Sequence, residues 1–421
     1  MIQDLACDPL NVPVPVRPCR VAVLVNGVPH PKHGASIVLF YHYIEALCAA
    51  GFDILCVTIF RPGQRDEPAL KAFADSLSMH RCFQVYAIEL PRILEGYRLR
   101  IIDRRGHGEE LRRRVSEHQP DALVCFDIEC AALASDIAAP YKVAWLGDLA
   151  FETHWYNFKY GVMESPATIR SLPYHLAQRS GWKRVYRQTL AAFSDVVVSS
   201  KSSEARLHEL GIDSRYAPYP WPVTDGQVHE VAKPQKPRFV FFGTLVGLGS
   251  RSSFHFMFDR LYPILVQNWG RLGFEILIAG REQLPNWVAK RLQSLPEFKF
   301  LGFVDDIGSL IRGSHAVITP LDVPVGNRSR ILTAMAQKVL VISHENASLG
   351  NPDLVHERNC LLARSAEQFA LCMKRAVEEP ERARSMALAG YETYIERFSP
   401  EVAAPLFASK VKEKFGRGWN E

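Results

Sequence analysis

The segment Ser314–Ala363 decides the fold of this chain, and it reads SHAVITPLDVPVGNRSRILTAMAQKVLVISHENASLGNPDLVHERNCLLA. It opens with a short apolar, β-branched run, AVITPL, which is typical of a buried parallel strand. A loop with a glycine and two arginines follows, then the small-residue-rich helix ILTAMAQK and a second apolar strand, VLVISH. We therefore expect half of a doubly wound α/β sheet, in which ligands bind beyond the carboxyl ends of the strands.

Arg328 and Arg330 lie at the predicted start of that helix. A helix N-terminus offers unpaired N–H groups and the positive end of the helix dipole, so it attracts phosphate. The forked donors of two neighbouring arginines match phosphate oxygens. The pattern therefore indicates a phosphate-binding site. The alternative is that both arginines are solvated loop charges, and the spacing alone does not decide between the two.

The order of these pieces resembles the nucleotide-binding half of the group 1, or GT4-like, glycosyltransferases, which are retaining enzymes with the GT-B fold. That family has a G-x-R-x-K/R-I-L-E-A-M-A helix, then V-V-x-S, then G-x-P-E-L-V and N-G-L-L. The matching residues here are Gly326, Arg328, Arg330, Ile331, Leu332, Ala334, Met335, Ala336, Val341, Ser343, Gly350, Pro352, Asp353, Leu354, Val355, Asn359, Leu361 and Leu362. The family's two glutamates are replaced by Val325 and Thr333, so the donor or its recognition is expected to differ.

The resemblance implies two Rossmann-like, doubly wound α/β domains that face each other across a cleft. Residues 1–225 would form the acceptor-side domain, completed by a C-terminal helix at 400–421, and residues 226–399 would bind the nucleotide sugar. The implied reaction moves a sugar from a nucleotide-activated donor to a hydroxyl of a glycan or glycolipid, with no cofactor and no metal ion. The implied alternative, favoured by the missing glutamates, is a binding or scaffold protein that kept this fold and lost catalysis.

The composition is that of a globular protein. The chain has 421 residues, of which 48% are hydrophobic and 23% charged, which suits two domains of ordinary size. No apolar run is long enough to span a membrane. The N-terminal segment lacks the pattern of a signal peptide. Nine cysteines without a C-x-x-C pair predict reduced thiols and no zinc site. We expect a cytoplasmic protein, placed at the inner face of the membrane if its acceptor is lipid-linked.

A βαβ unit opens the chain, with strands at Arg20–Val25 and Asp53–Phe60 and a helix between them. Gly34 lies at the turn into that helix, where it would let backbone N–H groups approach a phosphate. A plain structural turn is the alternative. The resembled family has a Gly-Gly pair here, which implies a donor-binding role for Gly34, although His33 replaces the first glycine.

Carboxylates follow two further predicted strands: Asp127 and Glu129 after DALVCF, and Asp148 after YKVAWL. Because strand ends face the cleft of an open α/β sheet, Asp127 and Asp148 are candidates for acid–base or hydroxyl-binding work. The alternative for Asp127 is a helix N-cap. The resemblance implies a sugar-contacting role for Asp127 and, less directly, for Asp148 and His154.

The remaining candidates for donor binding follow from the same resemblance. Gly243 fits the family's F-x-G motif, Thr244 stands where the family has an arginine, and Arg251 is the nearest basic residue able to replace it. Val304 belongs to an L-G-F-V-x-D piece that in the family lies against the nucleobase. Ser343 and His344 end a strand at the same cleft, where a hydrogen-bonded structural histidine is the alternative for His344.

The segment Tyr97–Val115 is rich in arginine, with seven between Arg98 and Arg114. A solvated helix face is one interpretation, and a patch that binds anionic lipid is the other. The net charge of +5 is mild. Basic and aromatic residues do not interleave here, so nucleic acid is not an expected partner.

Overall fold

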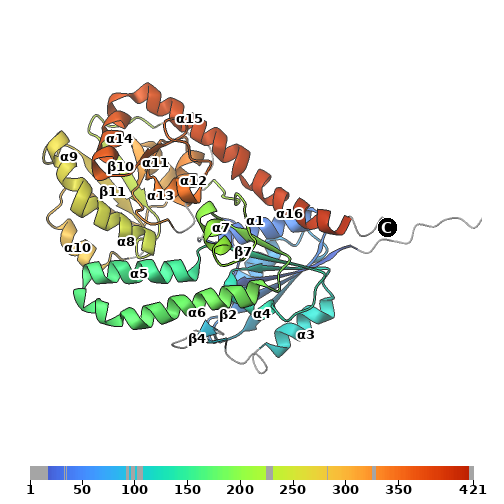
Figure 1. The fold of residues 1–421 in the computed structure, drawn as a ribbon. Coiled ribbons are helices and arrows are strands. Elements are labelled where there is room, and N and C mark those ends of the chain that lie inside the picture. The colour runs from blue at the N-terminus through green and yellow to red at the C-terminus, as the bar shows by residue number, and fades with distance from the viewer. Residues whose placement is uncertain are drawn as a thin grey trace, which may run out of the picture.

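The structure, a computed structural model, describes residues 18–32, 34, 36–91, 94–95, 100–101, 108–223, 231–281, 283–324 and 329–416. Within them lie two all-parallel sheets, one of seven strands and one of six, each flanked by helices (Figure 1). The predicted fold class, two doubly wound α/β domains, is confirmed.

The N-terminal domain is built on a sheet with the strand order β3-β2-β1-β6-β7-β8-β9. Its central strands are continuous apolar runs buried on both faces, as expected for a parallel sheet covered by helices on each side. Its strands are β1 (Arg20–Asn26), β2 (Asp53–Phe60), β3 (Phe83–Glu89), β6 (Ala122–Phe126), β7 (Tyr141–Leu146), β8 (Asp195–Val198) and β9 (Arg215–Tyr216). A separate antiparallel pair is formed by β4 (Leu94–Glu95) and β5 (Arg100–Ile101).

Most helices of this domain connect consecutive strands of the sheet. They are α1 (Ser36–Ala49), α2 (Glu67–Ser76), α3 (Glu109–His118), α4 (Ile128–Ala134) and α7 (Lys201–His208). The connection from β7 to β8 is longer. It consists of α5 (Ala150–Glu164), the 3₁₀ turn η1 (Pro166–Ser171) and α6 (Leu172–Leu190). α5 and α6 pack side by side as a helical hairpin that extends along the C-terminal domain (Figure 1).

The C-terminal domain has the strand order β12-β11-β10-β13-β14-β15. Its strands are β10 (Arg238–Phe242), β11 (Glu275–Ala279), β12 (Phe298–Gly302), β13 (Ala316–Thr319), β14 (Val341–His344) and β15 (Leu361–Ala363). Its helices are α8 (Leu248–His255), α9 (Tyr262–Trp269), α10 (Asn286–Leu292), α11 (Ile307–Arg312), α12 (Ser329–Ala336), α13 (Asn346–Gly350), α14 (Ala366–Glu378) and α15 (Pro380–Arg397). The strand–helix–strand unit predicted for Ser314–Ala363 is therefore present as β13, α12 and β14.

One helix differs from its prediction. The sequence predicts a single helix over His255–Gln267, whereas the structure has α8, a π-helical segment η2 (Phe256–Leu261) and α9 in its place. Pro263 lies in the first turn of α9 and has no backbone N–H to donate to the preceding turn. The wider turn before the proline is consistent with that missing hydrogen bond.

The chain returns to the N-terminal domain at its end. α16 (Pro400–Gly416) packs on α1, where the rings of Tyr43 and Phe407 lie 4.7 Å apart. The interdomain linker is held at the same place, because the backbone N–H of Trp221 donates to the carbonyl of Phe398 at 2.8 Å. One cluster of buried apolar side chains runs from the N-terminal sheet through this junction into the C-terminal domain.

None of the helices in the described part of the chain is both long enough and apolar enough to cross a membrane.

Candidate functional site

Segments that follow the carboxyl ends of both sheets contact each other between the domains. Ser202, in α7 after β8, donates its hydroxyl to the carbonyl of Pro324, which follows β13, at 3.0 Å. Tyr216 donates to the carboxylate of Asp353 at 3.1 Å. Because parallel sheets bind ligands beyond their carboxyl ends, this interface is the place where a site is expected.

A cavity of about 350 Å³ opens at that interface. It is lined by Leu149, Glu152, Lys201, Ser202, Ser203, Ala205, Arg206 and Glu209 of the N-terminal domain and by Pro324 and Leu349 of the C-terminal domain. Its walls thus come from both domains, with cationic and anionic groups on the N-terminal side and apolar ones on the C-terminal side.

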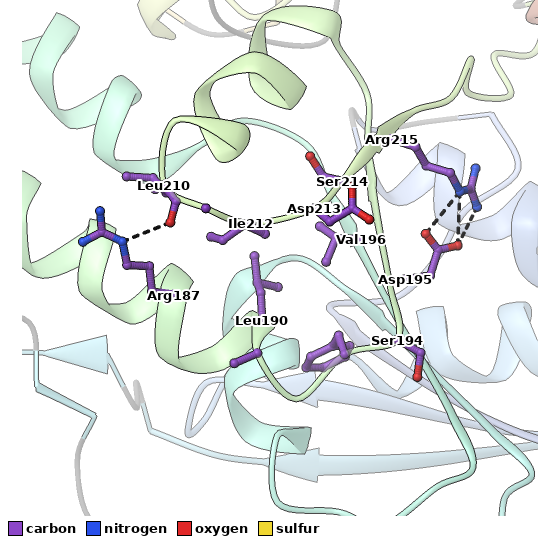
Figure 2. Close-up of a pocket in the computed structure, with 13 residues that line it drawn as sticks. Arg187, Leu190, Ser194, Asp195, Val196, Leu210, Ile212, Asp213, Ser214 and Arg215 are labelled. Carbon is purple, nitrogen blue, oxygen red and sulfur yellow. Dashed lines mark hydrogen bonds and ion pairs between the residues drawn. The ribbon is translucent and has the colours of Figure 1, made fainter.

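A larger cavity of about 490 Å³ lies elsewhere, at the amino ends of β8 and β9 (Figure 2). Three of the charged side chains that line it are bound within the protein. Asp195 pairs with Arg215 at 2.7 Å, and Arg187 donates to the carbonyl of Leu210 at 3.2 Å. Since this cavity lies at the edge opposite the strand carboxyl ends, it is not the expected ligand site.

Arg330 organises the turn between β10 and α8. Its guanidinium donates to the carbonyls of Phe242 and Thr244, the latter at 2.7 Å, and to the hydroxyl of Ser250. It also lies over the ring of Phe241, with its central carbon 4.6 Å from the ring centre. The donor-binding role of Arg330 stays a prediction. Its contacts indicate that Arg330 would act by fixing the shape of the β10–α8 turn.

Gly243 lies against this arginine. It has φ +110°, a conformation that favours glycine, and a Cβ built on it would be 3.0 Å from Nε of Arg330. The turn then enters α8, whose N-cap, Gly247, makes no side-chain capping hydrogen bond. The first N–H groups of α8 therefore have no side-chain acceptor at the cap. The Arg330 guanidinium lies next to this first turn of α8.

Arg251 in α8 points toward the other domain. Its guanidinium forms a two-pronged ion pair with Glu164 at the end of α5, and it donates to the carbonyl of Asn157 at 3.4 Å. His255 contacts the same carboxylate at 3.3 Å. Burial opposes ionisation of Glu164, yet the Arg251 guanidinium lowers its pKa overall. The arginine predicted to hold the donor diphosphate is thus bound by a carboxylate in this structure.

Three other predicted donor residues are placed as follows. Ser343 is fully buried, and its hydroxyl bonds to carbonyls inside the sheet, that of Thr319 at 3.2 Å. His344 is buried at the end of β14, where its Nδ1 accepts from the backbone of Asn346 at 3.2 Å. Burial lowers the pKa of His344, so it is neutral at pH 7. Val304 is half-buried just after β12.

Asp127 is the N-cap of α4, as the alternative interpretation expected. One carboxylate oxygen accepts the backbone N–H groups of Glu129 and Cys130 at 2.8 and 2.9 Å. The other accepts from the side chain of Asn26, at the end of β1, at 2.7 Å. Burial raises the pKa of Asp127 to about 6. Its three hydrogen bonds show a structural role, while the catalytic role stays a prediction.

Asp148 and His154 lie on either side of the start of α5. Asp148 is exposed in the turn after β7. His154 is half-buried and stacks on Trp182 of α6, with ring centres 5.9 Å apart. Burial, together with nearby His175, lowers the pKa of His154, so its imidazole is neutral at pH 7. Neither placement tests the predicted catalytic roles.

Several predicted features lie outside the described residues. They are Arg328, Gly326, Val325 and His33. Gly34 is described, in a bend before α1 with φ +102°. In the arginine-rich segment, Arg98, Arg104 and Arg105 are not described. Arg112, Arg113 and Arg114 on α3 form ion pairs with Asp136 or Glu117, which favours the solvated helix face for that part.

Sequence reasoning missed Glu164, Trp221 and the helical hairpin. It identified Thr333 as a departure from the resembled family but not its partner. Thr333 is buried and accepts a hydrogen bond from the indole of Trp221 at 2.9 Å. A proline-rich linker with a tryptophan, PYPWP, was the signal available for such an anchor.

Solved structures with this two-domain arrangement show that the chain has the GT-B fold. HepE from Anabaena in complex with UDP matches with a TM-score of 0.61 at 12% identity, over 94% of this chain and 100% of that one. Sucrose-phosphate synthase from Thermosynechococcus elongatus matches with a TM-score of 0.62 at 16% identity, over 95% of this chain and 100% of that one. A glycosyltransferase from Rickettsia africae matches with a TM-score of 0.63 at 13% identity, over 96% of this chain and 99% of that one.

Residues 236–379, about a third of the chain, match the family described as "Glycosyl transferases group 1". The C-terminal domain therefore carries the sequence signature of that family, and the resemblance found in Ser314–Ala363 is confirmed. No curated protein matches the chain.

Proposed function

We propose that the protein is a glycosyltransferase that moves a sugar from a nucleotide-activated donor to a hydroxyl of a glycan or glycolipid, with retention of anomeric configuration and without a metal ion. The observation that supports it most is the β10–α8 turn. There Gly243, the Arg330 guanidinium and the uncapped start of α8 lie together in the domain that carries the family signature.

The chemistry of the turn suits the leaving group of this reaction. When the sugar departs, negative charge develops on the diphosphate, and N–H groups with an adjacent guanidinium stabilise that charge. Arg330 would hold the turn in place, and Arg251 would add a second cation if the donor displaced Glu164. Closure between the domains would exclude water and limit hydrolysis of the donor.

The HepE complexes contain UDP and UDP-glucose. We therefore propose a uridine diphosphate sugar as the first donor to test. We further propose that the reaction takes part in the assembly of a surface glycan or glycolipid.

The alternative is a nucleotide-sugar-binding or scaffold protein without activity. The observation that favours it is Thr333, which stands in place of a family glutamate and bonds to Trp221. The two functions differ in what happens to the donor. An enzyme would release nucleoside diphosphate, faster with an acceptor, whereas a scaffold would bind the donor and leave it intact.

The experiment measures nucleoside diphosphate release from a panel of nucleotide sugars, with water alone and with simple alkyl glycosides as acceptors. Acceptor-dependent release by the wild type, lost in the Arg330→Ala variant, supports the transferase. Release of free nucleotide and an altered sugar without acceptor would indicate an epimerase instead. Donor binding with no release under any condition would favour the scaffold.

A further inference from the structure

The hairpin of α5 and α6 carries an exposed apolar tip, which we define as residues 163–176. Met163 is 48% exposed, Ile169 57%, Tyr174 43% and Leu176 48%. Exposed prolines and an alanine lie between them. Single exposed apolar residues are ordinary, but a cluster at the end of a projecting element indicates a binding surface.

The charges within the tip are few, and the acidic one is bound. Glu164 is its only acidic residue, and that carboxylate is held by Arg251 of the C-terminal domain. Arg170 is its only basic residue, and it is exposed. The tip therefore presents apolar side chains and one cation to solvent.

Behind the tip, the hairpin is basic. Residues 150–190 contain six arginines and lysines and two glutamates, a formal charge of +4 in a chain whose total is +5. The second glutamate, Glu152, is buried and pairs with Arg179 at 3.2 Å. No carboxylate among the described residues forms an ion pair with Lys159, Arg170 or Lys183. Lys159 precedes Met163 by about one helical turn, or roughly 6 Å.

We propose that the hairpin tip binds an anionic lipid surface. Apolar side chains of the tip would enter the boundary between headgroups and acyl chains. Lys159 and Arg170 would contact the phosphate groups, and Lys183 would add long-range attraction. The charge of the hairpin favours this occupant over a neutral apolar partner. The arrangement also differs from the arginine-rich segment of the sequence, whose described arginines on α3 are paired with carboxylates.

The position of the hairpin gives this contact a consequence for the reaction. α5 starts directly after β7, at the carboxyl edge of the N-terminal sheet, and ends at the ion pair of Glu164 with Arg251. A lipid surface at the tip would thus lie at the end of a helix that begins beside the interdomain site. This consequence rests on the proposed function, whereas the lipid contact itself does not.

The test is sedimentation of the full chain with vesicles of phosphatidylcholine alone or of equal parts phosphatidylcholine and phosphatidylglycerol, without donor or acceptor. The wild type is expected to pellet with the anionic vesicles, less so as salt is raised, and not with the neutral ones. The Ile169→Asp/Leu176→Asp double variant is expected to bind about tenfold or more weakly, and Arg170→Glu severalfold more weakly.

Leu371→Asp is the matched control, because Leu371 is 56% exposed on α14 of the other domain. It should bind vesicles like the wild type, and melting temperatures show that each variant is folded. Failure of the wild type to pellet at low salt would overturn the proposal. So would equal binding by the tip variants, or loss of binding only when Arg112, Arg113 and Arg114 are replaced. A concentration-dependent dimer dissolved by Ile169→Asp, without vesicle binding, would make a second copy the occupant instead.

Discussion

The indole Nε1 of Trp221 donates a hydrogen bond of 2.9 Å to Oγ1 of Thr333, which links the interdomain linker to α12. Tyr394 of α15 donates to the carbonyl of Trp221 at 2.6 Å. The linker is therefore fixed from two helices of the C-terminal domain. At the position where the resembled family carries a glutamate, this chain uses a hydroxyl for an internal bond.

Replacing Thr333 by valine should destabilise the protein. The change keeps the shape of the side chain but leaves the buried Nε1 of Trp221 without an acceptor, at a cost of about 1–3 kcal/mol. Urea unfolding of Thr333→Val, Trp221→Phe and the double variant measures the coupling between the two side chains. We expect a coupling free energy of about 1 kcal/mol between Thr333 and Trp221. Strict additivity of the two single changes would show that the hydrogen bond does not contribute.

Asp127→Ala should lower the free energy of unfolding by about 1–2 kcal/mol, because the alanine can neither cap α4 nor accept from Asn26. An unchanged urea midpoint at pH 7 would contradict the capping role.

The same residue should make stability depend on pH. Burial raises the pKa of Asp127 to about 6, above the ordinary value of about 3.9, so the folded state holds this proton more tightly than the unfolded state. Its contribution to stability is therefore greatest at low pH and is lost as pH rises from about 4 to about 6. Urea unfolding at several pH values in this range should show a negative slope in the wild type relative to Asp127→Asn. Parallel pH profiles would rule out the raised pKa.

The strands and helices around Ser314–Ala363 could be predicted because local patterns determine them. Continuous apolar runs predict β13 and β14, and a capping aspartate, Asp306, starts α11, where its side chain accepts from the backbone N–H of Ser309 at 2.8 Å. The site was harder, because its contacts join residues far apart in sequence. The sequence predicts a donor-binding role for Arg251 because it is the nearest cation to Thr244, but its partner, Glu164, is 87 positions away. Nothing local in α5 indicates that pair, which depends on how the domains pack.

Glu164→Gln should tighten binding of the donor nucleotide. In this structure the carboxylate of Glu164 neutralises Arg251, and a diphosphate would have to displace it. Removing its charge should raise affinity severalfold, about 1 kcal/mol, while Arg251→Ala should lower it. Isothermal titration with nucleoside diphosphates checks both. If neither variant changes the affinity, Arg251 serves only to join the domains.

Arg330→Lys should weaken nucleotide binding by about tenfold or more although the charge is kept. Arg330 uses its planar fork to reach Thr244 and Ser250 together, which a lysine cannot do. Titration of the variant against the wild type measures the loss. Lys338→Arg on the same domain is a control that should bind normally. Equal affinities for Arg330→Lys and the wild type would show that the shape of the turn does not matter for the ligand.

The most direct test of the central claim, a nucleotide-sugar site at the β10–α8 turn between the domains, is a thermal-shift titration with nucleoside mono- and diphosphates and with UDP-sugars. Ligands that bind only the folded state stabilise it, by about 2.7 kcal/mol at a concentration of 100 Kd. We predict a saturable rise in Tm with one nucleoside diphosphate, reduced in Arg330→Ala. Absence of any rise with the whole set, at concentrations in the millimolar range, would contradict the account.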